Sequence, residues 1–343
     1  MRIYRRGDEG PEILDIQHRL IDLGFTLTSA EPTGSFGDAT DAAVRGFQAQ
    51  RSLRVDGLVG PDTWGQLVEA GFRLGDRTLY LRAPHLRGDD VRALQRKLDA
   101  LGFDPGKQDG VYGAATDAAV REFQRNVGDA GDGVVGLHTI ATLERMRPLE
   151  DVPGRGVVRE TEELRSIRGR LQGRVIAIDP GQATPEIGAN TQLSLARSLA
   201  AELARLGAKP EMLHDLDQDP AVSARAAAAN RLSATICVSL HLGEGLPEAS
   251  GPTCSYFGSQ ATYSPAGRHL AELILEELEH ELRLRGRLQR LTASMLRETQ
   301  MPAVQVEALV AANEAEANLL RAPDATTRLG RAIAEGVRRF FED

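Results

Sequence analysis

Residues 36–48 read FGDATDAAVRGFQ, and residues 112–124 read YGAATDAAVREFQ. The residues DGLVG at 56–60 recur as DGVVG at 132–136 with the same offset of 76 residues. Upstream, IQHRLIDLGF at 16–25 recurs as LQRKLDALGF at 94–103 with an offset of 78 residues. Self-similarity at a fixed spacing indicates an internal duplication. The first half of the chain is therefore expected to fold as two copies of one small unit.

The upstream block of each copy has the apolar spacing of an amphipathic helix. Its apolar residues recur in steps of three and four, which places them on one helical face. They are Ile13, Ile16, Leu20 and Leu23 in the first copy, and Val91, Leu94, Leu98 and Leu101 in the second. Gly24 and Gly102 follow directly and are expected to end this helix. The pattern predicts a first helix in each copy.

Two more helices complete the predicted unit. The second is expected to start at Thr40, as N-cap, and to run through Phe47. A short third helix is expected to begin near Pro61 and Thr63. The result is a three-helix unit of about 70 residues in each copy, with expected boundaries of 1–75 and 76–149.

The shared pattern resembles the peptidoglycan-binding domain 1 family, which implies binding of peptidoglycan or muropeptide precursors. It combines the first helix with the motif G-x-[FY]-G-x-x-T-x-x-A-V-x-x-F-Q and a closing D-G-x-[VL]-G. The alternative is that the repeated glutamines only build the fold; they are Gln17, Gln48, Gln95 and Gln124. The second copy departs from the family at 83–90 and at 137–139, which weakens the expectation of ligand binding there.

The charge and hydropathy of the chain exclude several classes of protein. Its 41 Lys and Arg residues face 49 Asp and Glu residues, for a net charge of -8, so no global attraction to nucleic acid is expected. We expect no membrane span and no export signal, and hence a cytoplasmic protein, because no apolar run has the required length. Cys237 and Cys254 are too few for a disulfide framework, and both are expected to be buried packing residues.

The composition changes after the second copy. Residues 150–172 are predicted to be a linker that can contain one short amphipathic helix. Beyond it, strand-like runs at 174–178, 209–213 and 235–240 alternate with helical stretches at 193–206, 221–232 and 266–282. This alternation predicts a central, mostly parallel sheet covered by helices on both faces.

Residues 173–343 resemble the zinc-dependent N-acetylmuramoyl-L-alanine amidase 3 family. Four landmarks occur in the family's order: DPG at 179–181, AN at 229–230, SLH at 239–241 and MPAVQVE at 301–307. The whole chain is thus expected to be a multidomain protein, with two small three-helix domains before an α/β amidase-like domain.

The resemblance also identifies the positions of a zinc site, and two of them lack a ligand. Hydrolysis in this family needs zinc on three protein ligands and a glutamate that moves protons. The resemblance places Gln182, a neutral amide, at the first ligand position and Gly188 at the second. His241 remains at the third, and Glu307 matches the proton-handling glutamate. Glu186 is a possible but weak substitute ligand, so no cofactor is expected unless the chain is a working amidase.

Cys237 lies four residues before His241 on the same predicted strand, so their side chains share one face of the sheet. One interpretation of this spacing is a metal site that uses Cys237 and His241 as a pair of ligands. Burial in the core is the favoured interpretation of Cys237.

Two repeats before an amidase domain resemble the actinobacterial cytoplasmic amidase-like regulators of cell-wall synthesis. This resemblance implies a partner, UDP-N-acetylglucosamine enolpyruvyl transferase, which such regulators activate. The first hypothesis is therefore a noncatalytic regulator or a protein that binds peptidoglycan precursors. The alternatives are a working zinc amidase that cleaves the amide between N-acetylmuramic acid and L-alanine, and a structural adaptor.

Overall fold

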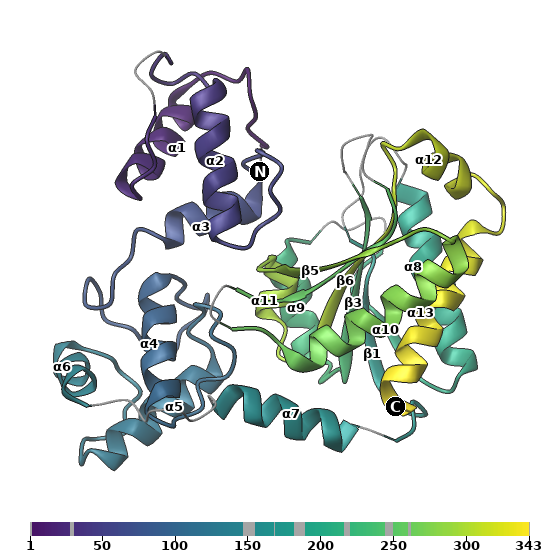
Figure 1. Cartoon of the computed structure of the whole chain (residues 1–343). Coiled ribbons are helices and arrows are strands. Elements are labelled where there is room, and N and C mark those ends of the chain that lie inside the picture. The colour runs from purple at the N-terminus through teal and green to yellow at the C-terminus, as the bar shows by residue number, and fades with distance from the viewer. Residues whose placement is uncertain are drawn as a thin grey trace. The chain divides into compact units, whose positions relative to one another are not determined.

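The structure is a computed structural model, and it describes residues 2–27, 31–146, 155–167, 169–181, 189–215, 220–243, 250–259 and 262–342. The chain divides into two compact units, Met1–Arg159 and Glu160–Asp343, and each is described by itself. Figure 1 labels the helices and strands of both units. None of the described helices combines the length and the apolar character needed to cross a bilayer.

The first unit contains the two predicted three-helix copies, called repeat 1 and repeat 2 below. Repeat 1 consists of α1 (Pro11–Asp22), α2 (Asp38–Gln50) and α3 (Pro61–Glu69), and repeat 2 of α4 (Asp89–Ala100), α5 (Ala114–Asn126) and α6 (Leu137–Arg145). Gly24 and Gly102 follow the first helix of each copy with φ of +89° and +86°, a conformation that favours glycine. The prediction that they end these helices is confirmed.

The expectation that Thr40 caps α2 is wrong. The N-cap is Gly37, and Thr40 lies inside the first turn with its side chain fully buried. The carboxylate of Glu31 accepts the backbone N–H groups of Ala39, at 2.7 Å, and Thr40, at 3.2 Å. A carboxylate from the preceding loop thus satisfies free donors of the helix start. The Thr40 hydroxyl donates to the same carboxylate and accepts from Gln17.

Gln17 and Gln95 occupy matching environments at 5% and 1% exposure. Each side-chain amide donates to a threonine hydroxyl and to a backbone carbonyl, and each accepts a glycine N–H at 2.8 Å. The partners are Ser35, Thr40 and Gly34 for Gln17, and Val111, Thr116 and Gly110 for Gln95. The same residue type therefore serves the same purpose in both copies.

Gln48 and Gln124 form a second matched pair. Each donates to an aspartate at 2.8 Å, Asp56 and Asp132 respectively, and each accepts a glycine N–H in the loop before the third helix. Buried backbone N–H groups need such partners. The repeated glutamines thus hold the loops of the repeats in place, which agrees with the interpretation that these residues build the fold.

The second unit is built on a six-stranded sheet in the order β2-β1-β3-β6-β4-β5. The strands are β1 (Val175–Asp179), β2 (Lys209–Met212), β3 (Ile236–Gly243), β4 (Thr253–Phe257), β5 (Arg287–Leu291) and β6 (Ala303–Val310). Every neighbouring pair is parallel except β4 and β6, so the prediction of a mostly parallel sheet is confirmed.

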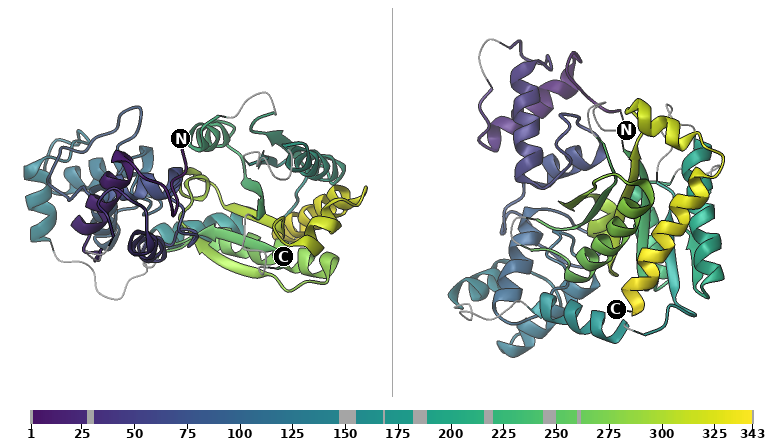
Figure 2. Two further views of the ribbon diagram at one scale, coloured as in Figure 1. Left: turned by 90° about the horizontal axis from the view of Figure 1, so that it is seen from above. Right: turned by 45° about the vertical axis from the view of Figure 1, so that its right-hand side comes forward.

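Helices cover both faces of this sheet (Figure 2). The larger apolar cluster joins one face to α8 (Ala189–Arg205), α10 (Pro265–Leu282) and α13 (Ala325–Glu342). The other face packs small residues, Ala177, Cys237 and Ala303, against α9 (Val222–Arg231) and α11 (Ser294–Glu298). Cys237 and Cys254 are both fully buried, as expected.

Several elements were not predicted from the sequence. They are β4, β5, β6, α11, α12 (Glu314–Leu320) and α13. The predicted linker contains α7 (Arg155–Ile167), and the division between the two units falls inside this helix. Within the second unit, the buried carboxylate of Glu160 on α7 accepts a hydrogen bond from Ser264 at 2.7 Å.

Candidate functional site

Polar side chains gather where the central strands end on the sheet face covered by α9. Side chains alternate along a strand, so the positions two and four residues beyond the buried Cys237 return to that face, and these are Ser239 and His241. Asp179 at the end of β1 pairs in register with Ser239, and Glu307 on β6 pairs with His241. Parallel pairing of β1, β3 and β6 thus brings these residues to one edge of the sheet.

Asp179 and Arg225 form a buried ion pair beneath this edge. Each side chain is 1% exposed, and Nη1 of Arg225 lies 2.6 Å from Oδ1 of Asp179. Burial alone would raise the pKa of Asp179, but the hydrogen bond from His214 and the charge of Arg225 lower it to about 2. Asp179 is therefore an ionised hydrogen-bond acceptor at neutral pH.

A chain of hydrogen bonds leads from this carboxylate to His241. The hydroxyl of Ser239 donates to Oδ2 of Asp179 at 2.6 Å, and its oxygen lies 3.0 Å from Nε2 of His241. Since Ser239 has one proton and gives it to the carboxylate, Nε2 of His241 must be the donor in the second bond. The neutral imidazole consequently carries its proton on Nε2 and its lone pair on Nδ1.

His214, just beyond β2, contacts the same carboxylate. Its Nε2 lies 3.4 Å from Oδ1 of Asp179, and its Nδ1 lies 3.3 Å from the backbone oxygen of Asp215. Both ring nitrogens have an acceptor within 3.4 Å, which favours the doubly protonated ring, whereas Nη1 of Arg225, a donor that also lies 3.4 Å from Nε2, opposes it. The hydrogen bond to Asp179 accordingly raises the pKa of His214, against the opposing effects of burial and of Arg225.

Glu307 lies on β6 beside His241, and its neighbours are polar. Gln305, two residues earlier on the same face, donates from Nε2 to Oε1 of Glu307 at 3.4 Å. On the other side of β6, the antiparallel strand β4 pairs Ser255 with Gln305 and Thr253 with Glu307. The half-buried carboxylate thus lies in a polar strip across β3, β6 and β4.

The positions that the sequence analysis assigned to metal binding are only partly described. His241 and Glu307 come together as adjacent register partners. Gln182, Glu186 and Gly188 lie outside the described residues. Across the part of the chain that the structure describes, no three His, Cys, Asp or Glu side chains are arranged to hold a metal ion. The described residues therefore do not fit a three-ligand zinc site, and no reaction step is derived through zinc.

Sequence reasoning missed three members of this network, Arg225, Ser239 and His214. Strand periodicity could have found Ser239, because it precedes His241 by two residues. Arg225 is the only charged residue in the run ARAAAA at 224–229, and a charge on an otherwise apolar helix face calls for a buried partner. No local pattern marks His214, whose contact with Asp179 depends on the pairing of β1 with β2.

The chain matches the N-acetylmuramoyl-L-alanine amidase family over residues 176–339. It matches the peptidoglycan binding domain family twice, over residues 9–67 and 87–143. These two matches coincide with repeat 1 and repeat 2, and the amidase match covers the sheet and the helices that pack on it.

Individual relatives agree with these matches. The chain is 35% identical to the N-acetylmuramoyl-L-alanine amidase CwlM of Mycobacterium tuberculosis, over 97% of this chain and 87% of that protein. It is 33% identical to the amidase CwlL of Bacillus licheniformis over 42% of this chain and 46% of that protein. The crystal structure of the amidase Ami1 from Mycobacterium smegmatis covers 50% of this chain and 99% of its own at 21% identity, with a TM-score of 0.45. The near full-length match to CwlM shows that this chain belongs to the N-acetylmuramoyl-L-alanine amidase family, with two peptidoglycan binding domains before the amidase domain.

Proposed function

We propose that this chain is a noncatalytic member of the amidase family that regulates peptidoglycan precursor synthesis. It would do so by activating UDP-N-acetylglucosamine enolpyruvyl transferase, by binding peptidoglycan precursors, or by both. The observation that carries the proposal is the identity of two residues at family ligand positions, Gln182 and Gly188. A neutral amide is a poor zinc ligand and glycine has no side chain, so one imidazole, His241, is left to hold the metal.

The retained features of the domain support a binding role. The ion pair of Asp179 with Arg225 and the hydrogen bond through Ser239 hold His241 at the strand edge. Buried charges are costly unless they are paired, and Asp179 and Arg225 pair with each other. The two repeats match a peptidoglycan binding family, which supports recognition of a peptidoglycan-derived ligand.

The regulatory role is tested by adding the full chain to purified UDP-N-acetylglucosamine enolpyruvyl transferase and measuring the initial rate. We expect the rate to rise with the concentration of the chain and to saturate. A chelator should leave this activation unchanged, because the proposed role needs no zinc. An unchanged rate, together with no binding of soluble muropeptide precursors by calorimetry, would contradict the proposal.

The alternative is a working zinc amidase that cleaves the amide between N-acetylmuramic acid and L-alanine. Two observations favour it: the relatives are named as amidases, and His241 and Glu307 are adjacent in register. This function requires a further ligand, such as Glu186. Release of stem peptides from peptidoglycan by the unmodified chain, abolished by a chelator, would establish it.

A variant with Gln182→His and Gly188→Glu is the positive control for this test. It should bind zinc, since three ligands would again be present, although imperfect supporting contacts typically lower metal affinity or activity about 10–100-fold. Zinc affinity should fall when His241→Ala is added to the double variant. Equal affinities would show that His241 is not positioned as a ligand.

A further inference from the structure

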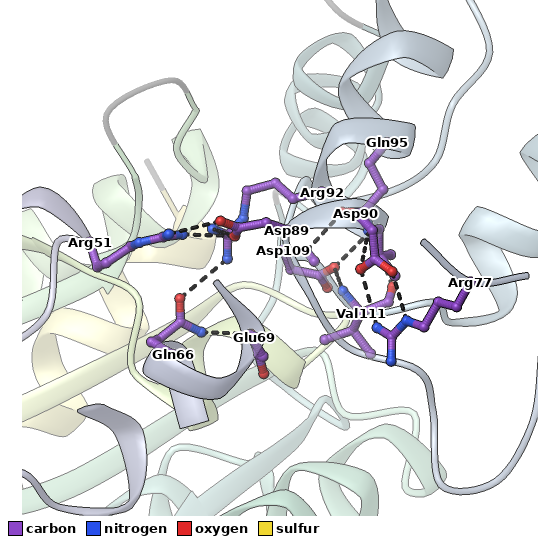
Figure 3. A network of polar contacts seen from close by, with 12 residues as sticks. Arg51, Gln66, Glu69, Arg77, Asp89, Asp90, Arg92, Gln95, Asp109 and Val111 are labelled. Atoms are coloured by element: carbon purple, nitrogen blue, oxygen red, sulfur yellow. Dashed lines mark hydrogen bonds and ion pairs between the residues drawn. The ribbon is translucent and has the colours of Figure 1, made fainter. Parts of the chain in front are cut away.

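The two repeats contact each other through a paired set of charged side chains (Figure 3). Arg51 follows α2 of repeat 1, and Asp89 is the first residue of α4 in repeat 2. Two parallel hydrogen bonds join them: Nη1 to Oδ1 at 2.7 Å and Nη2 to Oδ2 at 2.8 Å. The two side chains are 16% and 30% exposed. A planar guanidinium held on both carboxylate oxygens fixes orientation as well as distance.

The contact extends beyond this pair. Arg92, one turn further along α4, donates to Asp89 at 3.1 Å and to Gln66 of α3 at 3.5 Å. Gln66 in turn donates to Glu69 at 2.8 Å, and both of these side chains are buried. Positive and negative charges alternate from Arg51 to Asp89 to Arg92, so the surfaces of the two repeats are complementary in charge.

The duplication supplies an internal comparison for these five residues. Residues that build each repeat are kept in both copies, as Gln17 and Gln95 are. The residues of the contact are not kept. At the equivalent positions, Arg51 is matched by Val127, Gln66 by Thr142, Glu69 by Arg145, Asp89 by Pro11 and Arg92 by Leu14. The two copies therefore differ where they meet, as an asymmetric contact between them requires.

The segment that joins the repeats is also held in place. Arg77 donates to Oδ2 of Asp90 at 2.7 Å and to the backbone oxygen of Arg87 at 2.5 Å, and its guanidinium lies 3.7 Å from the ring centroid of Phe72. Asp90 is 1% exposed. This connection resembles a fixed turn more than a flexible linker, because its charged groups are paired within the fold.

We propose that repeats 1 and 2 form one rigid double module, in which the N-terminal end of α4 is an interaction surface for repeat 1. Asp89 serves the contact with repeat 1, and Asp90 serves the connection between the repeats. This inference does not depend on the proposed regulatory function.

The test is a distance measurement between one spin label on each repeat of the full chain. Exposed, equivalent positions are available on the first helices, as His18→Cys and Arg96→Cys, and both native cysteines are fully buried. Pulsed electron paramagnetic resonance on the otherwise unmodified chain should give a single narrow distribution of distances between the two labels. Arg51→Glu should broaden it, because two carboxylates would then face each other. Adding Asp89→Arg to Arg51→Glu should narrow it again.

Arg125→Glu is the matched control, because it makes the same charge change on an exposed arginine of α5 and should leave the distribution narrow. If the Arg51→Glu chain fails to fold, Arg51→Gln is the milder variant, because it removes the charge of Arg51 without reversing it. This variant should broaden the distance distribution as well. A broad distribution in the unmodified chain, or a narrow one in both Arg51 variants, would overturn the proposal.

Discussion

The two units bury polar side chains for different purposes. In the repeats, the matched buried polar groups are neutral glutamines, and their hydrogen bonds go to loops of the same repeat. In the amidase domain, the polar groups buried beneath the strand edge include an ion pair, Asp179 with Arg225, whose contacts lead through Ser239 to His241. The repeated polar residues of the first unit therefore maintain its fold, whereas the unrepeated charged network of the second unit maintains the candidate site.

The largest effect is expected from breaking the ion pair. Arg225→Met would leave the Asp179 carboxylate buried without its main partner, and removal of one member of a buried pair costs roughly 3–5 kcal/mol. Hydrogen exchange should accelerate across β1, β3 and α9. Arg231→Ala, on the exposed part of the same helix, is the control and should cost less than about 0.5 kcal/mol. Equal exchange in the two variants would show that the pair does not stabilise the domain.

The repeated glutamines should matter less, and equally in both copies. Gln17→Leu leaves the part-buried N–H of Gly34 without its acceptor and Gln95→Leu leaves the buried N–H of Gly110 without its acceptor, at a cost of about 1–3 kcal/mol. Hydrogen exchange should rise in α1 and α2 for the first variant and in α4 and α5 for the second. Unequal losses of protection from hydrogen exchange would mean that Gln17 and Gln95 do not contribute equally to the stability of their repeats.

A smaller energetic effect, but a specific spectroscopic one, is expected from Ser239→Ala. Loss of one hydrogen bond costs about 1 kcal/mol, while the imidazole of His241 loses the acceptor that keeps its proton on Nε2. Nitrogen-15 spectra of the ring should report the Nε2–H tautomer in the unmodified chain and a mixture in the variant. Ser239→Thr keeps the hydroxyl and should keep the single tautomer. A mixture in the unmodified chain would contradict this arrangement.

The smallest effect concerns pH. Because the folded chain raises the pKa of His214, the stabilisation from its charged ring is fully present below the pKa of the unfolded chain. It is lost as the pH rises through the higher pKa of the folded state. A proton titration of the His214 ring should give a pKa above the ordinary histidine value, and Asp179→Asn should lower it. A measured pKa at or below the ordinary histidine value would show that the His214 ring is not stabilised in its charged form by Asp179.

Sequence reasoning reached the repeats and three of the six strands, β1, β2 and β3, because each rests on local periodicity. Thr40 was misassigned because a threonine before an apolar run has the pattern of an N-cap, and only the tertiary contact with Glu31 shows that the cap is supplied from elsewhere. The antiparallel strand β4 was missed because it is only five residues long, and so short a run is ambiguous in the sequence.

The candidate site was predictable to a similar extent. His241 and Glu307 could be chosen from motifs, and the strand register brings them together. Their support could not be predicted, because Arg225 and His214 reach Asp179 from elements that are distant in sequence. Pairing across a sheet depends on which strands become neighbours, and no local residue pattern states that order.

We propose that this domain keeps a hydrogen-bonded network around His241 without a full set of zinc ligands. The most direct measurement is the zinc content of the full chain after saturation with zinc and dialysis. We predict far less than a stoichiometric amount, with no difference between the unmodified chain and His241→Ala. Stoichiometric zinc in the unmodified chain, lost in His241→Ala, would contradict the claim.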